Sequence, residues 1–519
     1  MNTRYFTVAG SNRRYDRNWM LAVLLISLML SLLQVSSVNN LLASIQGSMH
    51  SSETDIQFVL SGYALAVGIT LVPTGRLGDM FGRPGMWVTG LTIFTLASLG
   101  CGLADNALHL NLLRVLQGIG AGFYSPQVTG LIQQYFQGKA RARAFGYMGL
   151  VVAVSVALGP LISGTLVQIF GSQTGWRYSF FINVPIGVVG IIAATQFLPF
   201  ANAHKGAEAQ DHLESDASRS TASGSDSVSS EVRETSSPTA PRRSQLDLDP
   251  LGMVLLVAAV LCIMLPFMLH TITWRFALLP CAVVLLVTWV WWEKRYARLG
   301  NLPMVDMSMF RLRSFTYCTA IGGLQFLGSS TIFVVLALFI QQGLHGTALD
   351  VGLIGLPYAV LSGTAAMWSG KHSIEYGKQI QVLGLSLIVT SVVMTGFISW
   401  GLADRGWSHW WLILGLLPLG LGAGSMGAAN QTTAMMDVPA ANGGTAGGLQ
   451  QTTQRIATAI GNALITGVLY STYRGGTTSA DWYLGLAAGL AVIAVCITCA
   501  LVLAIVFEHR SRKYASVSV

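Results

Sequence analysis

Apolar runs of about 20 residues recur along the whole chain, and a helix needs a run of that length to cross a bilayer. Only 10% of the 519 residues are charged, whereas soluble domains carry roughly 25%. These few charges could not cover the surfaces of several soluble domains. This excludes a soluble enzyme, a disordered protein and a disulfide-rich secreted domain. We predict an all-α polytopic membrane protein with fourteen spans, near residues 19–42, 56–74, 85–104, 108–130, 144–169, 178–199, 251–270, 274–292, 316–340, 351–369, 380–402, 409–432, 444–470 and 483–507.

The distribution of Lys and Arg predicts how these spans are oriented. If the N-terminus is cytoplasmic, the inside segments hold 24 of the 30 basic residues, the outside loops hold 4, and Arg114 and Arg455 lie within spans. An excess of bases on the cytoplasmic side is the general rule for membrane proteins. We therefore expect cytoplasmic termini, formed by residues 1–18 and 508–519.

Residues 200–249 are rich in Ser, Thr, Ala and acids and show no apolar periodicity. Such a segment cannot bury enough apolar surface to fold. We expect a disordered cytoplasmic linker here, and a plain tether is favoured over a site of regulatory phosphorylation. Residues 294–315 are expected to form a further cytoplasmic loop.

A degenerate internal repeat divides the spans into two sets. Gly75–Arg83 and Gly370–Lys378 both contain a glycine, a second glycine seven residues later, a following base, and an acid between the glycines. Each copy follows the second span of a set of six. Internal duplication is a property of transporters, which hold substrate between their halves. We therefore expect two six-span bundles, 19–199 and 316–507, with two inserted spans at 250–293.

The first copy of the repeat is a candidate for a gating motif. Its functional residues would be Gly75, Asp79, Gly82 and Arg83. Asp79 stands at a span end, where it can pair with a base or with the N-terminus of a neighbouring helix. A cytoplasmic latch that breaks and reforms is favoured over a simple tight turn, because a second copy exists.

Two further motifs lie within spans. Arg114, with Gln117 and Gly118, stands where a charge is expensive and normally faces a cavity or a partner, although an arginine that reaches to an interface is the alternative. Gly159, Pro160 and Gly164 interrupt another span, since proline removes a helical hydrogen bond. This bend is either a hinge that seals the pathway or a static kink.

Several amides and one hydroxyl within spans are candidates for lining a substrate cavity. Each alone is more often a contact between helices than a ligand contact. The candidates are Gln34, Asn39, Tyr124, Gln127, Gln325 and Asn430.

No pattern for catalysis, a cofactor or a metal stands out in the chain. Gly422–Gly427 matches a dinucleotide-binding pattern in letters only, because it lies inside an apolar run with no strand before it. Cys496 and Cys499 also lie in an apolar run, where packing is favoured over redox or metal chemistry. We predict no catalytic residues, no metal and no cofactor, and therefore no enzyme.

The chain resembles the major facilitator superfamily, specifically its fourteen-span drug:proton antiporter branch. The resemblance rests on four motifs in the expected order, at Gly75–Arg83, Arg114–Gly122, Gly159–Gly164 and Gly175–Gly187. It implies the major facilitator fold and a multidrug-efflux type of transporter. One departure concerns Gln34, which stands where this branch usually carries an aspartate in its first span.

A glutamine cannot titrate, and no carboxylate stands at the centre of any expected span. Cation binding in a low-dielectric cavity usually needs a compensating carboxylate. We therefore expect a preference for neutral or anionic amphipathic substrates over dications. Proton coupling would use Asp79 or another acid at a span end, or would be weak.

The favoured function is export of small amphipathic or drug-like molecules by alternating access, driven by the proton gradient. The first alternative is an uncoupled or weakly coupled facilitator or exporter of one metabolite, and the second is a non-transporting membrane sensor. We expect the partners to be a small-molecule substrate, protons and the lipid bilayer, with no nucleic acid, and the protein to be a monomer. The lack of an organelle-targeting pattern favours the plasma or inner membrane.

Overall fold

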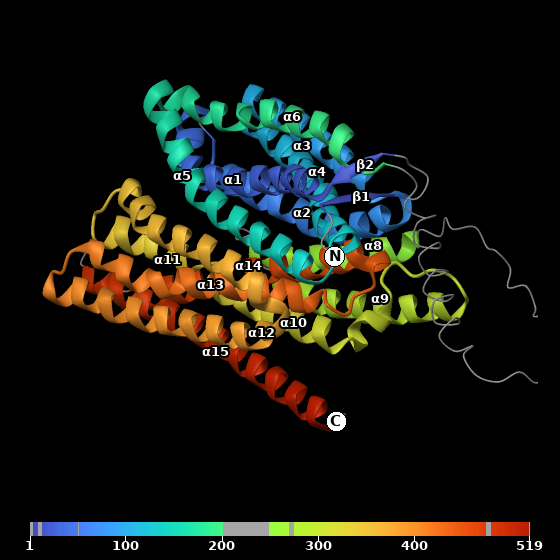
Figure 1. The fold of residues 1–519 in the computed structure, drawn as a ribbon. Helices are drawn as coiled ribbons and strands as arrows, with labels where there is room; N and C mark the ends of the chain where they lie inside the picture. Colours follow the sequence, from blue (N-terminus) through green and yellow to red (C-terminus); the bar gives the residue numbers. More distant parts are fainter. Residues whose placement is uncertain are drawn as a thin grey trace, which may run out of the picture.

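The computed structural model describes residues 4–8, 13–49, 51–200, 249–268, 275–473 and 479–517. Two groups of helices lie one above the other in Figure 1. The N-terminal group comprises α1 (Arg17–Met49), α2 (Glu53–Phe81), α3 (Arg83–Leu103), α4 (Ala107–Tyr135), α5 (Gly138–Phe181) and α6 (Asn183–Phe197). The C-terminal group comprises α10 (Arg313–Ser329), α11 (Ile332–Leu338), α12 (Ala348–Arg405), α13 (Leu412–Ala434), α14 (Gly443–Thr472) and α15 (Ser479–Val517).

Two further helices, α8 (Pro250–Met268) and α9 (Leu278–Arg298), pack against each other. Helix α8 also contacts α2 and α14, so this pair lies beside the boundary between the two groups. Short helical turns η1 (Arg275–Ala277), η2 (Met307–Arg311), η4 (His409–Trp411) and η5 (Ala440–Asn442) precede helices, and a π-helical turn, η3 (Phe339–Gly343), follows α11.

The expected all-helical architecture is confirmed for the two groups. A small hairpin, formed by β1 (Tyr5–Thr7) and β2 (Arg14–Asp16), precedes α1. This hairpin was not expected, because strands of three residues carry no periodic signal. Phe6 of this hairpin packs on the ring of Tyr135, 4.9 Å away between centroids, and so ties the hairpin to the end of α4.

Ten helical segments within the described residues are long and apolar enough to cross a membrane. Two of them are much longer than one crossing, and each is interrupted at a single residue. The first break is at Gly171, with φ 78° and ψ 162°, and the second is at Tyr376, with φ −121° and ψ 16°. The loops expected near these positions are therefore helical apart from the break. At Gly171 this is possible because glycine tolerates positive φ.

Other boundaries also differ from expectation. The expected span 316–340 is divided between α10, α11 and the π-helical turn. Helix α15 continues to Val517, past the expected end at 507. The expected linker, 200–249, lies outside the described residues except for its first and last positions, as does most of the turn before α9.

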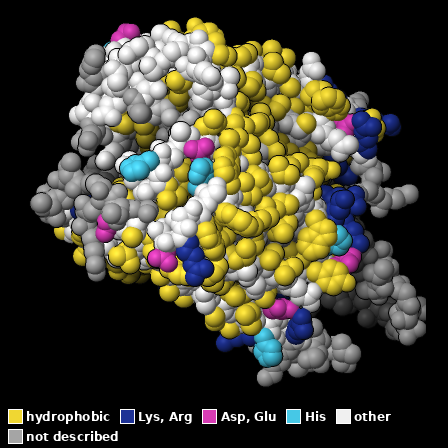
Figure 2. All heavy atoms as spheres, turned by 90° about the vertical axis from the view of Figure 1, so that its left-hand side faces the viewer, with side chains coloured by type: hydrophobic (Ala, Val, Ile, Leu, Met, Phe, Trp, Pro, Cys, Tyr) yellow, Lys and Arg dark blue, Asp and Glu magenta, His cyan; other side chains and the backbone are white. Residues whose placement is uncertain are grey.

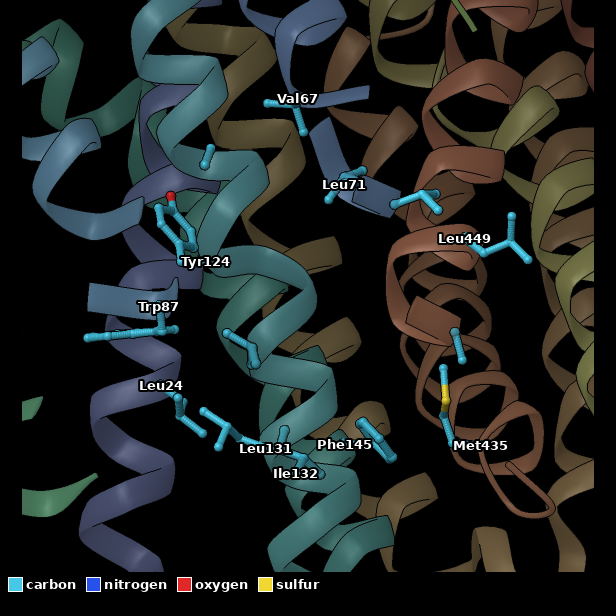
Figure 3. Packing of buried hydrophobic residues seen from close by; sticks show 14 of the residues in the cluster. Leu24, Val67, Leu71, Trp87, Tyr124, Leu131, Ile132, Phe145, Met435 and Leu449 are labelled. Carbon is cyan, nitrogen blue, oxygen red and sulfur yellow. The ribbon is translucent and has the colours of Figure 1, made fainter. Parts of the chain in front are cut away.

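One buried apolar cluster extends across the boundary between the two groups. Figure 3 shows Trp87 and Tyr124 of the N-terminal group in this cluster, with Met435 and Leu449 on the C-terminal side. Met264 of α8 belongs to the same cluster. A second cluster lies wholly within the C-terminal group. The two groups are therefore joined by apolar packing as well as by the polar contacts described below.

Candidate functional site

The carboxylate of Asp79, near the end of α2, connects the two groups of helices. Its Oδ1 accepts hydrogen bonds from Arg83, at 2.9 Å from Nε and 2.7 Å from Nη2, and from the backbone N–H of Gly444 at 3.0 Å. Its Oδ2 accepts from the backbone N–H and the hydroxyl of Thr445, both at 2.8 Å. Because α14 begins at Gly443, the carboxylate occupies the N-terminus of that helix, where free N–H groups and the helix dipole favour a negative charge.

The guanidinium of Arg83 extends the same connection. Nη1 donates to the carbonyl of Gly130 and to Gln134 Oε1, both at 2.8 Å. Nη2 donates across the boundary to the carbonyls of Ala440, at 2.6 Å, and Ala441, at 3.1 Å. The side chains of Asp79 and Arg83 are 3% and 5% exposed, so this ion pair is buried and fully hydrogen-bonded.

Glycine allows the two helices to approach this closely. A Cβ on Gly75 would lie 2.5 Å from the carbonyl oxygen of Gly444, so any larger residue would force α2 and α14 apart. Gly82 has φ 105°, a conformation that other residues rarely adopt. We call the contact of Gly75, Asp79 and Arg83 with the segment 440–445 the first junction.

Gln133, which is not among the expected site residues, strengthens the first junction. Its Nε2 donates to the carbonyls of Met435, at 2.9 Å, and Val438, at 2.7 Å, in the segment before α14. A glutamine near the end of an apolar run gives no signal of this kind, since its partners lie about 300 residues further along the chain.

The second copy of the repeat makes a related contact at the other side of the boundary. A Cβ on Gly370 of α12 would lie 2.7 Å from Cα of Gly146 and 2.8 Å from the carbonyl oxygen of Ala142, both in α5. Glu375 forms an ion pair with Lys139, with 2.7 Å between Oε1 and Nζ. The side chain of Glu375 is 54% exposed and that of Lys139 is 63% exposed. We call the contact of Gly370 and Glu375 with Lys139 and Gly146 the second junction.

Arg114 lies in α4 with no exposed surface. Nε donates to the carbonyl of Val59 at 2.9 Å, and Nη1 donates to Gln117 Oε1 at 2.5 Å. The guanidinium carbon stands 4.3 Å from the ring centroid of Tyr63, a cation–π contact. Within the described residues no carboxylate pairs with this charge, which is held by helix carbonyl, amide and aromatic groups alone. Gly118 makes room for α2, since its Cβ would lie 2.5 Å from the carbonyl of Tyr63.

Helix α1 compensates the hydrogen bond that Pro160 removes from α5. Proline lacks an N–H, so the carbonyl four residues earlier loses its helical donor. That carbonyl belongs to Val156, and the hydroxyl of Ser36 donates to it at 2.8 Å. Ser37 donates to the carbonyl of Gly159 at 3.0 Å. Helix α5 therefore continues through Pro160, where it contacts α1 closely, whereas the space in front of Gly164 is open.

Gln34 does not stand free in the interior. Its Oε1 accepts a short hydrogen bond from Nδ2 of Asn183, the first residue of α6, and both side chains have no exposed surface. The remaining amide atoms, Nε2 of Gln34 and Oδ1 of Asn183, are buried without a described partner. The position that usually carries an acid is therefore occupied by an amide pair between α1 and α6.

The other cavity candidates are not brought together into one site. Tyr124 and Gln127 have no exposed surface, and Gln127 donates to the carbonyl of Thr74 at 2.7 Å. Gln325 donates to Ser329 at 2.9 Å on its own helix. Asn430 is 3% exposed, whereas Asn39 is exposed.

Two cavities, of about 690 and 740 Å³, lie near α8 and α9, and none of the six candidates lines either. Figure 2 shows the molecule from the left-hand side of Figure 1, where hydrophobic side chains gather across the middle of the surface. Within the described ranges, no group of three or more His, Cys, Asp or Glu residues is placed to hold a metal.

Comparison with characterised proteins gives relatives along most of the chain. The chain is 29% identical over 473 residues to the probable actinorhodin transporter of Streptomyces coelicolor. The matched region covers 90% of this chain and 75% of that protein. It is 27% identical over 455 residues to the tetracenomycin C resistance and export protein of Streptomyces glaucescens, covering 85% and 73%. It is 26% identical over 435 residues to the multidrug resistance protein Stp of Mycobacterium tuberculosis, covering 83% and 72%.

Solved structures share the fold at low sequence identity. The human organic anion transporter MFSD10 superposes with a TM-score of 0.62 at 14% identity, covering 94% of this chain and 99% of that one. The proton:xylose symporter XylE gives a TM-score of 0.61 at 13% identity, covering 92% and 94%. The sequence model of the Major Facilitator Superfamily matches residues 24–274 and 318–518. The chain therefore belongs to the Major Facilitator Superfamily, a family of membrane transporters.

Proposed function

We propose that this transporter exports small amphipathic molecules by alternating access, and that the arrangement described here is closed at its cytoplasmic end. One observation carries the proposal: the first junction joins residues more than 360 positions apart, one in each group of helices, through a buried carboxylate. A buried charge that loses its partners is strongly unfavourable. Separation of the two groups at this end therefore has to break a defined set of bonds.

The membrane topology that fits this proposal has fourteen spans in two sets of six, with α8 and α9 as an inserted pair. Ten apolar segments are long enough to cross a membrane. Two of them contain a break, at Gly171 and at Tyr376. If the chain reverses direction at each break, these ten segments make twelve spans. Helices α4 and α14, of 29 and 30 residues, supply the other two, since about 20 residues cross a bilayer. With this topology the N-terminus and both junctions lie on the basic, cytoplasmic side of a cell membrane.

The interior favours neutral or anionic amphiphiles as substrates. Arg114 is buried without a described carboxylate partner, and Gln34 with Asn183 replaces an acid that would compensate a cation. The relatives named above are called transporters of, or resistance proteins against, antibiotics and drugs. This supports export of an organic molecule but names no substrate for this chain.

The energy source that we propose is the proton gradient, with Asp79 as the first candidate for the coupling acid. Uncoupled or weakly coupled movement of one metabolite is the alternative, and it is favoured by the amide pair of Gln34 and Asn183, which cannot titrate.

Transport in proteoliposomes under an imposed pH gradient tests these proposals. The panel is a dication, a monocation, a neutral and an anionic fluorescent amphiphile. We expect gradient-driven movement of the neutral or anionic probe, abolished by a protonophore. Movement that follows only the probe's own gradient would support the uncoupled alternative, and no movement of any probe would favour a narrow metabolite exporter or a non-transporting role.

A substitution at the first span sharpens the substrate test. Gln34→Asp restores an acid at this position and should shift preference toward monocationic and dicationic probes. Asn18→Asp, on the same helix but exposed and not a cavity candidate, is the matched control. Robust dication export by the unsubstituted protein would overturn the preference.

A further inference from the structure

Two carboxylates meet at the junction of α8 and α9, away from the sites described above. Asp249 immediately precedes α8, and Glu293 lies near the end of α9. The two helices pack against each other, which brings the start of one beside the end of the other. Neither side chain has any exposed surface.

One oxygen of each carboxylate is hydrogen-bonded to the protein. Oδ1 of Asp249 accepts from the backbone N–H of Gly252 at 2.9 Å and from the indole N–H of Trp292 at 2.8 Å. Oε2 of Glu293 accepts from the backbone N–H of Val305 at 3.4 Å. The side chains are therefore held in place from α8, from α9 and from the segment that leads to η2.

The other oxygen of each carboxylate is buried without a described partner. Both of these oxygens point toward Gly252: a Cβ on that residue would lie 2.3 Å from Oδ2 of Asp249 and 2.8 Å from Oε1 of Glu293. The two unpartnered oxygens thus lie within 3 Å of one point. Glycine is required there because a methyl group would occupy that space.

No described Lys or Arg forms an ion pair with either carboxylate. Charged side chains are present on the elements in contact with this end of the two helices, namely Lys294, Arg295 and Arg298 on α9, Asp306 and Arg311 at η2, and Arg76 on α2. Two buried carboxylates this close together, with no counter-ion among the described residues, make it unfavourable for both to be ionised.

We propose that Asp249 and Glu293 form a proton-binding site in which one proton is shared between the two side chains. The proton neutralises one of the two converging carboxylates, so that a single negative charge remains. A Ca²⁺ ion takes about 6–8 oxygen ligands, whereas among the described residues only these two carboxylates converge on the point next to Gly252. The proposal does not depend on the transport function.

The site has a route for protons. A cavity of about 740 Å³ is lined by Glu293 together with Lys294, Arg298, Asp306 and Arg311. These charged groups surround a polar opening next to the buried pair. The proton can therefore exchange with solvent through this cavity, although Glu293 itself has no exposed surface.

The proton-binding site is also connected to the first junction by packing. Helix α8 contacts α2 and α14, the two helices that the first junction joins. A Cβ on Gly68 of α2 would lie 2.9 Å from the sulfur of Met264 of α8, which shows how closely these helices approach. Loss of the proton would create repulsion at one end of α8, and the pH would then act on the boundary between the two groups.

The direct test uses the full chain in lipid nanodiscs and infrared difference spectra between acidic and alkaline pH. We expect a carbonyl band of a protonated carboxylic acid that disappears at alkaline pH and is absent from both Glu293→Gln and Asp249→Asn. Glu508→Gln, which removes the partner of Arg512 on α15, is the matched control and should keep the band. If a variant does not fold, carbon-13 labelling of Glu alone or Asp alone in the unsubstituted chain identifies the group.

Thermal unfolding supplies a second readout. If a site binds a proton more tightly in the folded chain than in the unfolded chain, the folded chain loses stability as the pH rises and the proton leaves. The Tm of the unsubstituted chain should therefore fall with rising pH more steeply than that of Glu293→Gln. A band unchanged in both variants or absent from the unsubstituted chain would overturn the proposal. So would a Tm raised by Na⁺, Mg²⁺ or Ca²⁺ in the unsubstituted chain and not in Glu293→Gln, since a cation would then occupy the site.

Discussion

The two junctions place a glycine and an acid from one repeat copy against a helix of the opposite group, but they differ in depth. At the first junction Asp79 is 3% exposed and is bound by Arg83 and by the N-terminus of α14. At the second junction Glu375 is 54% exposed and pairs with Lys139 alone. The glycines, in contrast, approach their partner helices almost equally closely.

This difference indicates that close backbone approach and charge contribute separately to the contact between the two groups of helices. Hydrogen bonds to buried ionised groups are stronger than neutral ones, and removing one partner leaves an uncompensated charge. An exposed ion pair contributes about 0–1 kcal/mol, because water and salt screen it. We infer that the first junction holds the two groups together by charge and packing, whereas the second relies on packing.

The largest effect is expected from Asp79→Asn. It leaves Arg83 buried without its carboxylate and removes the negative charge from the N-terminus of α14. We expect a loss of about 3–5 kcal/mol in stability of the closed arrangement, measured by thermal unfolding and by the reactivity of a cysteine introduced at the boundary. A change no larger than that of Glu375→Gln would contradict the proposed difference between the junctions.

Substitution of the basic residue should also cost more stability at the first junction than at the second. Arg83→Lys loses the planar fork that reaches Asp79, Gly130 and Ala440 together, and we expect a cost of about 1–3 kcal/mol, because each hydrogen bond to a charged group contributes about that much. The reciprocal change, Lys139→Arg at the second junction, should leave Tm almost unchanged. Equal effects of the two changes would show that the fork geometry of Arg83 is unimportant.

Substitution of the glycines, in contrast to that of the charged residues, should cost a similar amount of stability at both junctions. Gly75→Ala and Gly370→Ala each place a methyl group within 3 Å of the opposite helix, and overpacking of this kind costs about 1–3 kcal/mol. We expect similar losses of Tm for both. Gly164→Ala, where the Cβ meets open space, is the control and should have little effect.

The smallest effect is expected from Glu375→Gln. The ion pair with Lys139 is exposed, so its loss should cost less than about 1 kcal/mol and the difference should vanish in high salt. Tm measured at low and high ionic strength checks this. A large effect that persists in salt would mean that the second junction also depends on its charge.

Much of the architecture could be predicted from local pattern. The apolar runs located the helices, and the motif spacing placed Asp79 and Arg83 at helix ends, whereas α5 continues through Pro160, where a bend was expected. The break at Gly171 falls between the expected spans 144–169 and 178–199, in the polar stretch 171–175, but no pattern in the sequence indicated that the chain is helical again directly after a single residue. Gln133 and Asn183 were not identified as partners, since their contacts are distant in sequence.

The sequence by itself determined that the chain is helical and apolar, because hydrophobic periodicity is a local property. The tertiary structure alone decided which polar groups are paired. It placed Asp79 on the N-terminus of α14, paired Gln34 with Asn183, and brought Asp249 against Glu293. Burial and distance between helices decide these pairs, and neither can be read from residues that lie tens or hundreds of positions apart.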